Sequence, residues 1–191
     1  MLRDYWAKCM RWLYRVWRDP VGRAALLMAV LALGCLTLMR LPPKFSSASK
    51  PQNFPGNSGL EVQFLRDTED LRLTLGDYPS VDRQTMREKL QIDFAFILAY
   101  SGLFVSLSFL MARAGGWKRI AAIFGALCGV GAGIFDMVEN LASLRILDVP
   151  IRLTTQAMLD AIHTPALIKW SLSGAAIVLL LTQFIPRPKT S

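Results

Sequence analysis

Six polar side chains border or interrupt strongly apolar stretches of this sequence, and their types could form a binding or catalytic site. They comprise three carboxyls, one amide, one ammonium and one phenol, at Asp93, Tyr100, Asp136, Glu139, Asn140 and Lys169. A charged side chain that faces lipid at the centre of a bilayer costs roughly 2.5 to 3.5 kcal/mol, and less near the interface. We therefore expect these side chains to face the protein interior and to contact one another.

Helical spacing places several of these side chains on shared faces. Asp136 lies three residues before Glu139 and four before Asn140, so these three side chains share one face of a helix. Asp93 and Tyr100 are seven residues apart, which is close to two helical turns. Together with Lys169 from a further helix, they form a candidate ligand-binding site.

Several kinds of chemistry are open to this set. A carboxylate beside a lysine in a low dielectric can act as an acid or a base. An excess of carboxylates over lysine can instead bind a cation or carry a proton. A metal site is not expected, because the chain has one histidine and zinc sites usually use more His or Cys. No nucleophile elbow, phosphate loop or paired-cysteine motif occurs, and the sequence identifies no cofactor.

Four apolar stretches must position these residues, and each approaches the roughly 20 residues that a helix needs to cross about 30 Å of hydrocarbon. We therefore predict an all-α membrane protein, a four-transmembrane-helix bundle. The predicted transmembrane helices cover residues 20–41, 91–113, 117–141 and 165–185.

The distribution of positive charge predicts the orientation of this bundle. A net charge of +8 can indicate a nucleic-acid partner, but here Lys and Arg gather before the first span, between the second and third, and after the fourth. Positive loops stay in the cytoplasm. We predict a multi-pass protein of the cell inner membrane with cytoplasmic N and C termini, including a tail at residues 186–191. Its expected partners are the lipid bilayer and other membrane-protein subunits, with no nucleic acid.

Residues 1–19 are predicted to form an interfacial amphipathic helix. Tyr5 and Trp17 lie on its apolar face, and Lys and Arg side chains occupy the opposite face. Aromatic rings suit the headgroup region and the cations suit anionic lipids, although a helix that docks on a partner protein is the alternative. Asp19 and Pro20 then have the residue types of an N-cap and a first helical turn.

The segment at residues 42–90 is expected to be a small extracytoplasmic cap. It starts with a linker rich in Pro, Ser, Asn and Gly at residues 42–58. Thr68 can cap a short helix that Gly76 ends, and Ser80 can cap a helix that runs into the second span. The segment has too little apolar material for an independent domain, so we expect it to cover the outer ends of the bundle.

Two further local predictions concern residues outside the spans. Residues 60–65 alternate weakly between apolar and polar types and are expected to be extended. In the outer loop at residues 142–164, residues 154–162 are predicted to form a short amphipathic helix, and Thr164 and Pro165 to restart the chain into the fourth span. Where the third helix ends stays open.

Small residues and the single histidine receive structural interpretations. Gly125, Gly129 and Gly133 recur every four residues in the third span, which predicts a smooth ridge for close helix packing rather than chemistry. His163 precedes Thr-Pro, and a solvated loop position is expected for it in preference to a place in the site.

Two short elements resemble a loose group of uncharacterised small bacterial multi-pass membrane proteins. The elements are D-x-x-F-I-x-x-Y, from Asp93 to Tyr100, and D-x-x-E-N, from Asp136 to Asn140. The resemblance singles out residues of the candidate site and implies no particular reaction.

Three functions remain open at this point. The leading hypothesis is that the protein binds a small polar ligand, an ion or a lipid headgroup at the outer-side carboxylate and lysine site, alone or as a subunit of a larger complex. The first alternative is an enzyme acting on lipid, with Asp136 or Glu139 as the acid or base. The second is a purely structural accessory subunit, whose glycine ridge and amphipathic N-terminal helix dock on partners. In that case Lys169 pairs with Asp136 or Glu139 only to hold two helices together.

Overall fold

The computed structural model describes residues 17–40, 60–113 and 115–182, together with Trp6, Met10 and Tyr14. The predicted linker at residues 42–58 and the tail at 186–191 lie outside the described residues. Most of the predicted interfacial helix at residues 1–19 lies outside them as well, so these three assignments stay predictions.

Four long helices dominate the described part of the chain, and it contains no strand. They are α2 (Pro20–Leu38), α5 (Val81–Ala112), α6 (Gly116–Leu147) and α7 (Gln156–Leu181). Each is long and apolar enough to cross a membrane. The prediction of an all-α bundle with four membrane spans is confirmed, and the four helices indicate a multi-pass membrane protein.

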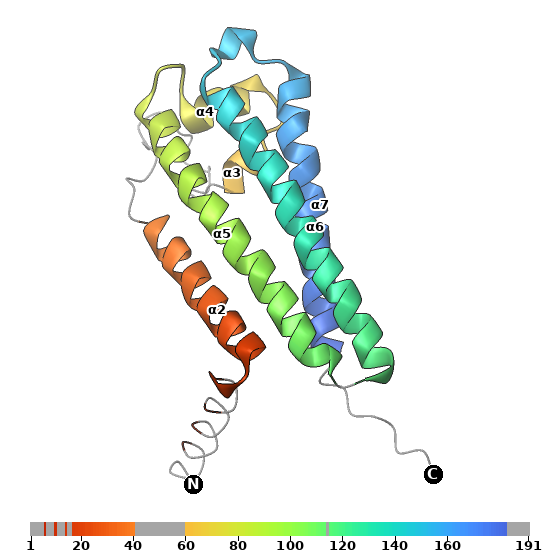
Figure 1. Ribbon diagram of the computed structural model, residues 1–191. Helices are drawn as coiled ribbons and strands as arrows, with labels where there is room; N and C mark the ends of the chain where they lie inside the picture. The colour runs from red at the N-terminus through yellow and green to blue at the C-terminus, as the bar shows by residue number, and fades with distance from the viewer. Residues whose placement is uncertain are drawn as a thin grey trace.

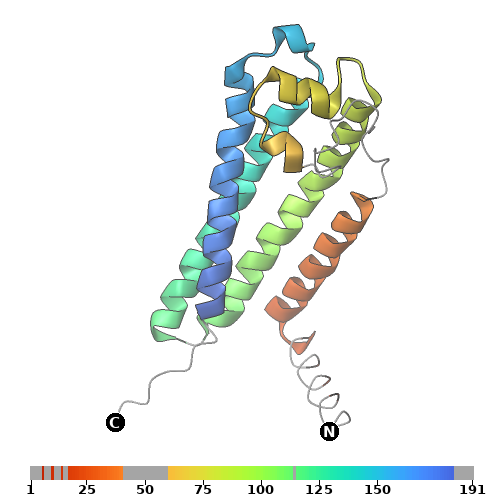
Figure 2. The same cartoon turned by 180° about the vertical axis from the view of Figure 1, so that it is seen from behind.

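The bundle is arranged around α6 rather than around a central axis. α6 packs on both α5 and α7, whereas α5 and α7 have little contact with each other. α2 lies along the side of α5 that faces away from α7 (Figures 1 and 2). A side chain that needs partners from three helices must therefore lie where α5, α6 and α7 come together.

At the start of α2, the predicted cap is confirmed and is also tied to α5. The Asp19 carboxylate accepts a hydrogen bond of 2.9 Å from the Val21 backbone N–H, and Pro20 occupies the first turn. Arg113 at the end of α5 forms an ion pair with Asp19. The Arg113 guanidinium lowers the pKa of the Asp19 carboxyl below its ordinary value, so this ion pair persists at neutral pH.

The predicted glycine ridge of α6 is where α5 packs most closely. A Cβ atom at Gly129 would lie 2.9 Å from Phe104 Cγ, and one at Gly125 would lie 3.4 Å from Ser108 Oγ. A Cβ atom at Gly133 would likewise meet the side chain of Ser101. Three α5 side chains therefore fill the three gaps that the missing Cβ atoms leave, which is the packing that small residues allow between membrane helices.

Both α5 and α6 are longer than a bilayer is thick. Each has 32 residues and so spans about 48 Å at about 1.5 Å per residue, compared with about 30 Å of hydrocarbon. α5 begins ten residues before the predicted span, and Ser80 caps it by accepting a hydrogen bond from the Arg83 N–H. α6 continues to Leu147, which settles the open question of its end.

The segments before α5 form two short helices over one end of the bundle, here called the cap end (Figures 1 and 2). α3 (Leu60–Gln63) is helical, so the prediction of an extended segment there was wrong. α4 (Thr68–Leu75) ends at Gly76, whose φ of 69° suits glycine, as predicted. Its N-cap is Asp67 rather than Thr68, because the Asp67 carboxylate accepts the Asp70 N–H.

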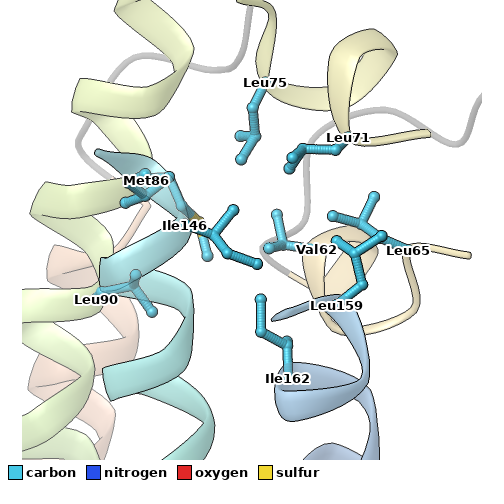
Figure 3. Close-up of a cluster of buried hydrophobic side chains, with 10 residues drawn as sticks. Val62, Leu65, Leu71, Leu75, Met86, Leu90, Ile146, Leu159 and Ile162 are labelled. Atoms are coloured by element: carbon cyan, nitrogen blue, oxygen red, sulfur yellow. The ribbon is translucent and has the colours of Figure 1, made fainter. Parts of the chain in front are cut away.

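A hydrophobic core joins these short helices to the long ones (Figure 3). Its buried residues come from α3, α4, the start of α5, the end of α6 and the start of α7, and from Leu65 between α3 and α4. They are Val62, Leu65, Leu71, Leu75, Met86, Leu90, Ile146, Leu147, Leu159 and Ile162. The expected cap is therefore packed on the bundle and has no separate core.

The fourth span differs from its prediction at its start. α7 runs without interruption from Gln156 through Pro165, which lies inside the helix. The predicted separate helix at residues 154–162 and the restart at Pro165 were therefore wrong. Leu159, Ile162 and Ala166 are buried at helical spacing across this point. Their burial holds the helix together, although the proline removes one backbone hydrogen bond.

Arg83 links the cap end into one unit. Its Nη1 donates to the carbonyl oxygens of Ile146 at 2.9 Å, Leu147 at 3.2 Å and Val149 at 3.0 Å. Its Nε donates to the Gly76 carbonyl at 3.1 Å. The guanidinium thus donates to carbonyl groups at and just after the C-terminal end of α6, where helical carbonyls lose their usual partners and a positive charge is favourable.

Replacing Gly129, which faces Phe104, tests the close packing at the glycine ridge of α6. Gly129→Ala should lower the free energy of unfolding by about 1 to 3 kcal/mol, because the new methyl group meets the fixed Cβ end of Phe104. Gly174→Ala is the control, since a Cβ there has open space around it. Thermal unfolding in detergent compares them, and equal stability of the two variants would contradict the close packing.

Removing the Arg83 guanidinium tests its role at the end of α6. Arg83→Met should destabilise the protein by about 2 to 4 kcal/mol, because several buried carbonyl groups lose a charged donor. Arg87→Met removes an ion pair to Asp148 that is partly exposed, and it should cost less than about 1 kcal/mol. Hydrogen exchange at residues 146–149 should rise only in the Arg83 variant.

Candidate functional site

The Lys169 ammonium is the centre of the candidate site. From α7, its Nζ lies 2.6 Å from Asp136 Oδ1 and 2.6 Å from Glu139 Oε2, both on α6. The side chains of Lys169 and Asp136 are 7% exposed and that of Glu139 is 2% exposed. Two buried carboxylates on adjacent turns of one helix therefore share a single ammonium from the next.

Tyr100 supplies the contact from α5. Its hydroxyl donates a hydrogen bond of 2.9 Å to Asp136 Oδ2. The ring lies between Phe96 and Phe104, with centroid distances of 5.3 and 6.2 Å. These rings restrict the position of the phenol, so both oxygens of Asp136 have fixed donors: Lys169 on one and Tyr100 on the other.

A second polar contact joins α5 and α6 one helical turn closer to the cap end. Asn140 Nδ2 donates a hydrogen bond of 2.7 Å to Asp93 Oδ2. Asn140 is buried, whereas Asp93 is half-buried. The partner of the Asp93 carboxylate is thus a neutral amide, which orients the carboxylate without balancing its charge.

All six residues that the sequence singled out are brought into this region. Asp136, Glu139, Tyr100 and Lys169 form one connected group, here called the buried quartet. Asp93 and Asn140 form the adjoining pair, because Asn140 follows Asp136 by one turn of α6. Their expected mutual contacts are confirmed, while a ligand-binding role for them stays a prediction.

His163 does not join the site, as expected, but it lies inside α7 and is half-buried, so the expected solvated loop position was wrong. Its Nδ1 lies 3.3 Å from the Gln63 carbonyl oxygen, and its ring meets the Phe64 ring edge-on at 6.0 Å. The Gln63 side chain also accepts a hydrogen bond of 3.0 Å from Trp170 Nε1. The sequence analysis did not predict the contacts of Gln63 with His163 and Trp170, because nothing in the local pattern of residues 60–65 indicates that α3 rests against α7.

The site lies between two apolar regions. Leu90, Ile146 and Ile162 of the cap core lie on the same three helices as the site residues, nearer the cap end. The α6 glycine ridge begins with Gly133, three residues to the other side of Asp136. The site is therefore enclosed from both ends, which lowers the local dielectric and strengthens each electrostatic interaction within it.

The charges of the buried quartet do not balance when every group is ionised. Asp136 and Glu139 contribute two negative charges and Lys169 contributes one positive charge, and Asp93 adds a third carboxylate nearby. A buried charge without a counter-charge is strongly unfavourable. Within the described residues, no group of three or more His, Cys, Asp or Glu side chains could hold a metal ion.

No protein-family model, no curated protein and no solved structure matches this chain. The interpretation of the site therefore rests on its own geometry and charge.

Removing the shared ammonium tests whether the quartet is coupled. Lys169→Met leaves two buried carboxylates together and should lower the free energy of unfolding by about 3 to 5 kcal/mol. Adding Asp136→Asn and Glu139→Gln to this variant should recover part of that loss, because no buried charge then lacks a partner. Thermal unfolding in detergent measures both, and a triple variant less stable than Lys169→Met would contradict the coupling.

Proposed function

We propose that this protein is a binding protein of the cell inner membrane, with both termini in the cytoplasm, and that its outer-side carboxylate and lysine site binds a small polar ligand. We propose further that the ligand carries positive charge, either as an ion or as the cationic group of a lipid headgroup. The protein acts in the bilayer together with other membrane-protein subunits.

The excess of buried carboxylate over ammonium is the observation that carries this proposal. Lys169 can neutralise one of its two carboxylate neighbours, each 2.6 Å from Nζ. The remaining negative charge favours a cation over an anion or a neutral ligand. An anionic phosphate is a poor match, because the ammonium that would bind it is already held by two carboxylates.

The lipid-enzyme alternative receives less support from the geometry. An acid or base must have an oxygen free to exchange a proton with the substrate. Both Asp136 oxygens are occupied, by Lys169 and by Tyr100. Glu139 would be the remaining candidate, and it is 1% exposed.

One observation favours the structural alternative. Lys169 joins α7 to α6 through two ion pairs, and the same contacts would be made in a subunit that binds nothing. The two functions differ in one measurable respect. A ligand that binds the native state raises its stability in proportion to RT ln(1 + [L]/Kd), whereas helix fastening alone gives no dependence on added ligand.

A thermal-unfolding screen separates these functions. The purified protein is unfolded in neutral detergent with sodium, potassium, ethanolamine or phosphatidylethanolamine added to a buffer whose cation is bulky N-methylglucamine. We expect at least one probe to stabilise the wild type, by about 2.7 kcal/mol at one hundred times its Kd. Asp136→Asn/Glu139→Gln should remove this gain.

Asp160→Asn is the matched control. Asp160 is exposed on α7, where its partner is the Gln156 side chain, so this variant should respond to the probes as the wild type does. A wild type that none of the four probes stabilises would contradict the binding function and favour the structural subunit.

A further inference from the structure

We infer that, before its ligand binds, the buried quartet holds one proton, which Glu139 and Asp136 share beside Lys169. This inference rests on the proposed function, because it takes the site to need one exchangeable positive charge. It goes further by naming a proton as the positive charge that the site holds before the cation binds. Binding of a cation then releases that proton.

The partners of each carboxylate oxygen indicate where the proton resides. Asp136 has a donor on each oxygen, Lys169 Nζ at 2.6 Å and Tyr100 Oη at 2.9 Å, so neither of its oxygens lacks a hydrogen-bond donor. Within the described residues, Lys169 is the partner that the structure gives to Glu139, at 2.6 Å from Oε2. Glu139 is therefore the carboxyl that gains most from carrying its own proton.

The other groups around the quartet do not balance the excess negative charge of its two carboxylates. From α5, the site is faced by Asp93 and by the neutral phenol of Tyr100. From α7 it is faced by Lys169, and His163 on the same helix turns to Gln63 instead. Asp93 is held by a neutral amide. Its carboxylate therefore adds negative charge near Glu139 and makes protonation there more favourable.

Burial favours a proton over a larger ion in the closed site. Each charged member of the quartet is more than nine-tenths buried. A metal ion or an ammonium group would need several oxygen ligands and space between them. A proton needs neither and forms an O–H bond on a carboxyl group already in place.

The exchange step is balanced in charge and atoms. As the cationic ligand enters, the O–H bond of the protonated carboxyl breaks and the proton passes to water. The carboxylate left behind then pairs with the charge of the ligand. Net charge within the quartet is the same before and after, so the exchange adds no uncompensated charge to the buried region.

Infrared spectroscopy of the purified protein tests this inference directly, since a protonated buried carboxylic acid has a carbonyl stretching band that a carboxylate lacks. In N-methylglucamine buffer at neutral pH, the wild type should show one such band. Both Glu139→Gln and Asp136→Asn should lose it, because the one remaining carboxylate is balanced by Lys169. Asp160→Asn should keep the band, and either single variant suffices if the other does not fold.

Two results would overturn the inference. One is a wild type without the band at neutral pH. The other is a band that survives in Glu139→Gln and Asp136→Asn and disappears in Asp93→Asn, which would place the proton outside the quartet. If either occurs while sodium, potassium or ethanolamine still stabilises the protein, the cation-binding function stands and the inference of a shared proton is wrong. If no probe stabilises the protein, the binding function fails independently of the band.

Discussion

The contact between one ammonium and two carboxylates is the constraint on which the rest of this structure depends. Lys169 is a membrane-helix cation that must be neutralised, and both of its partners lie on α6. This pairing fixes the rotation of α7 against α6, and Tyr100 then fixes α5 through the same Asp136. Apolar packing alone would leave the rotation of α7 weakly specified, because lipid-facing and helix-facing surfaces are both apolar in a bilayer.

The fold encloses these charges by combining two different kinds of packing. On one side, glycines of α6 admit side chains of α5, so the two backbones approach closely. On the other side, large aliphatic residues from five helices fill the space where α5 and α7 diverge. Arg83 reinforces this second region by holding the end of α6 to the start of α5 and the end of α4.

Much of this arrangement could be predicted from residue types and spacing. The depth and shared faces of Asp93, Asp136 and Asn140 follow from a helical period in apolar sequence, and the glycine ridge follows from its four-residue repeat. Local signals failed where distant packing decides the outcome. Pro165 has the signal of a helix start, but buried neighbours on both sides keep α7 continuous. Residues 60–65 alternate weakly, yet α3 forms because Val62 is buried in the cap core.

The position of α2 has a consequence for how the protein could be assembled. α2 packs mainly on α5, where Met28 lies against Gly102, and it supplies none of the six site residues. The remaining helices contain the whole site and its enclosing layers. The chain is therefore divisible in principle: a fragment carrying α2 and a fragment carrying α3 to α7, made as separate polypeptides, have the complementary surface needed to reassociate side by side in a bilayer.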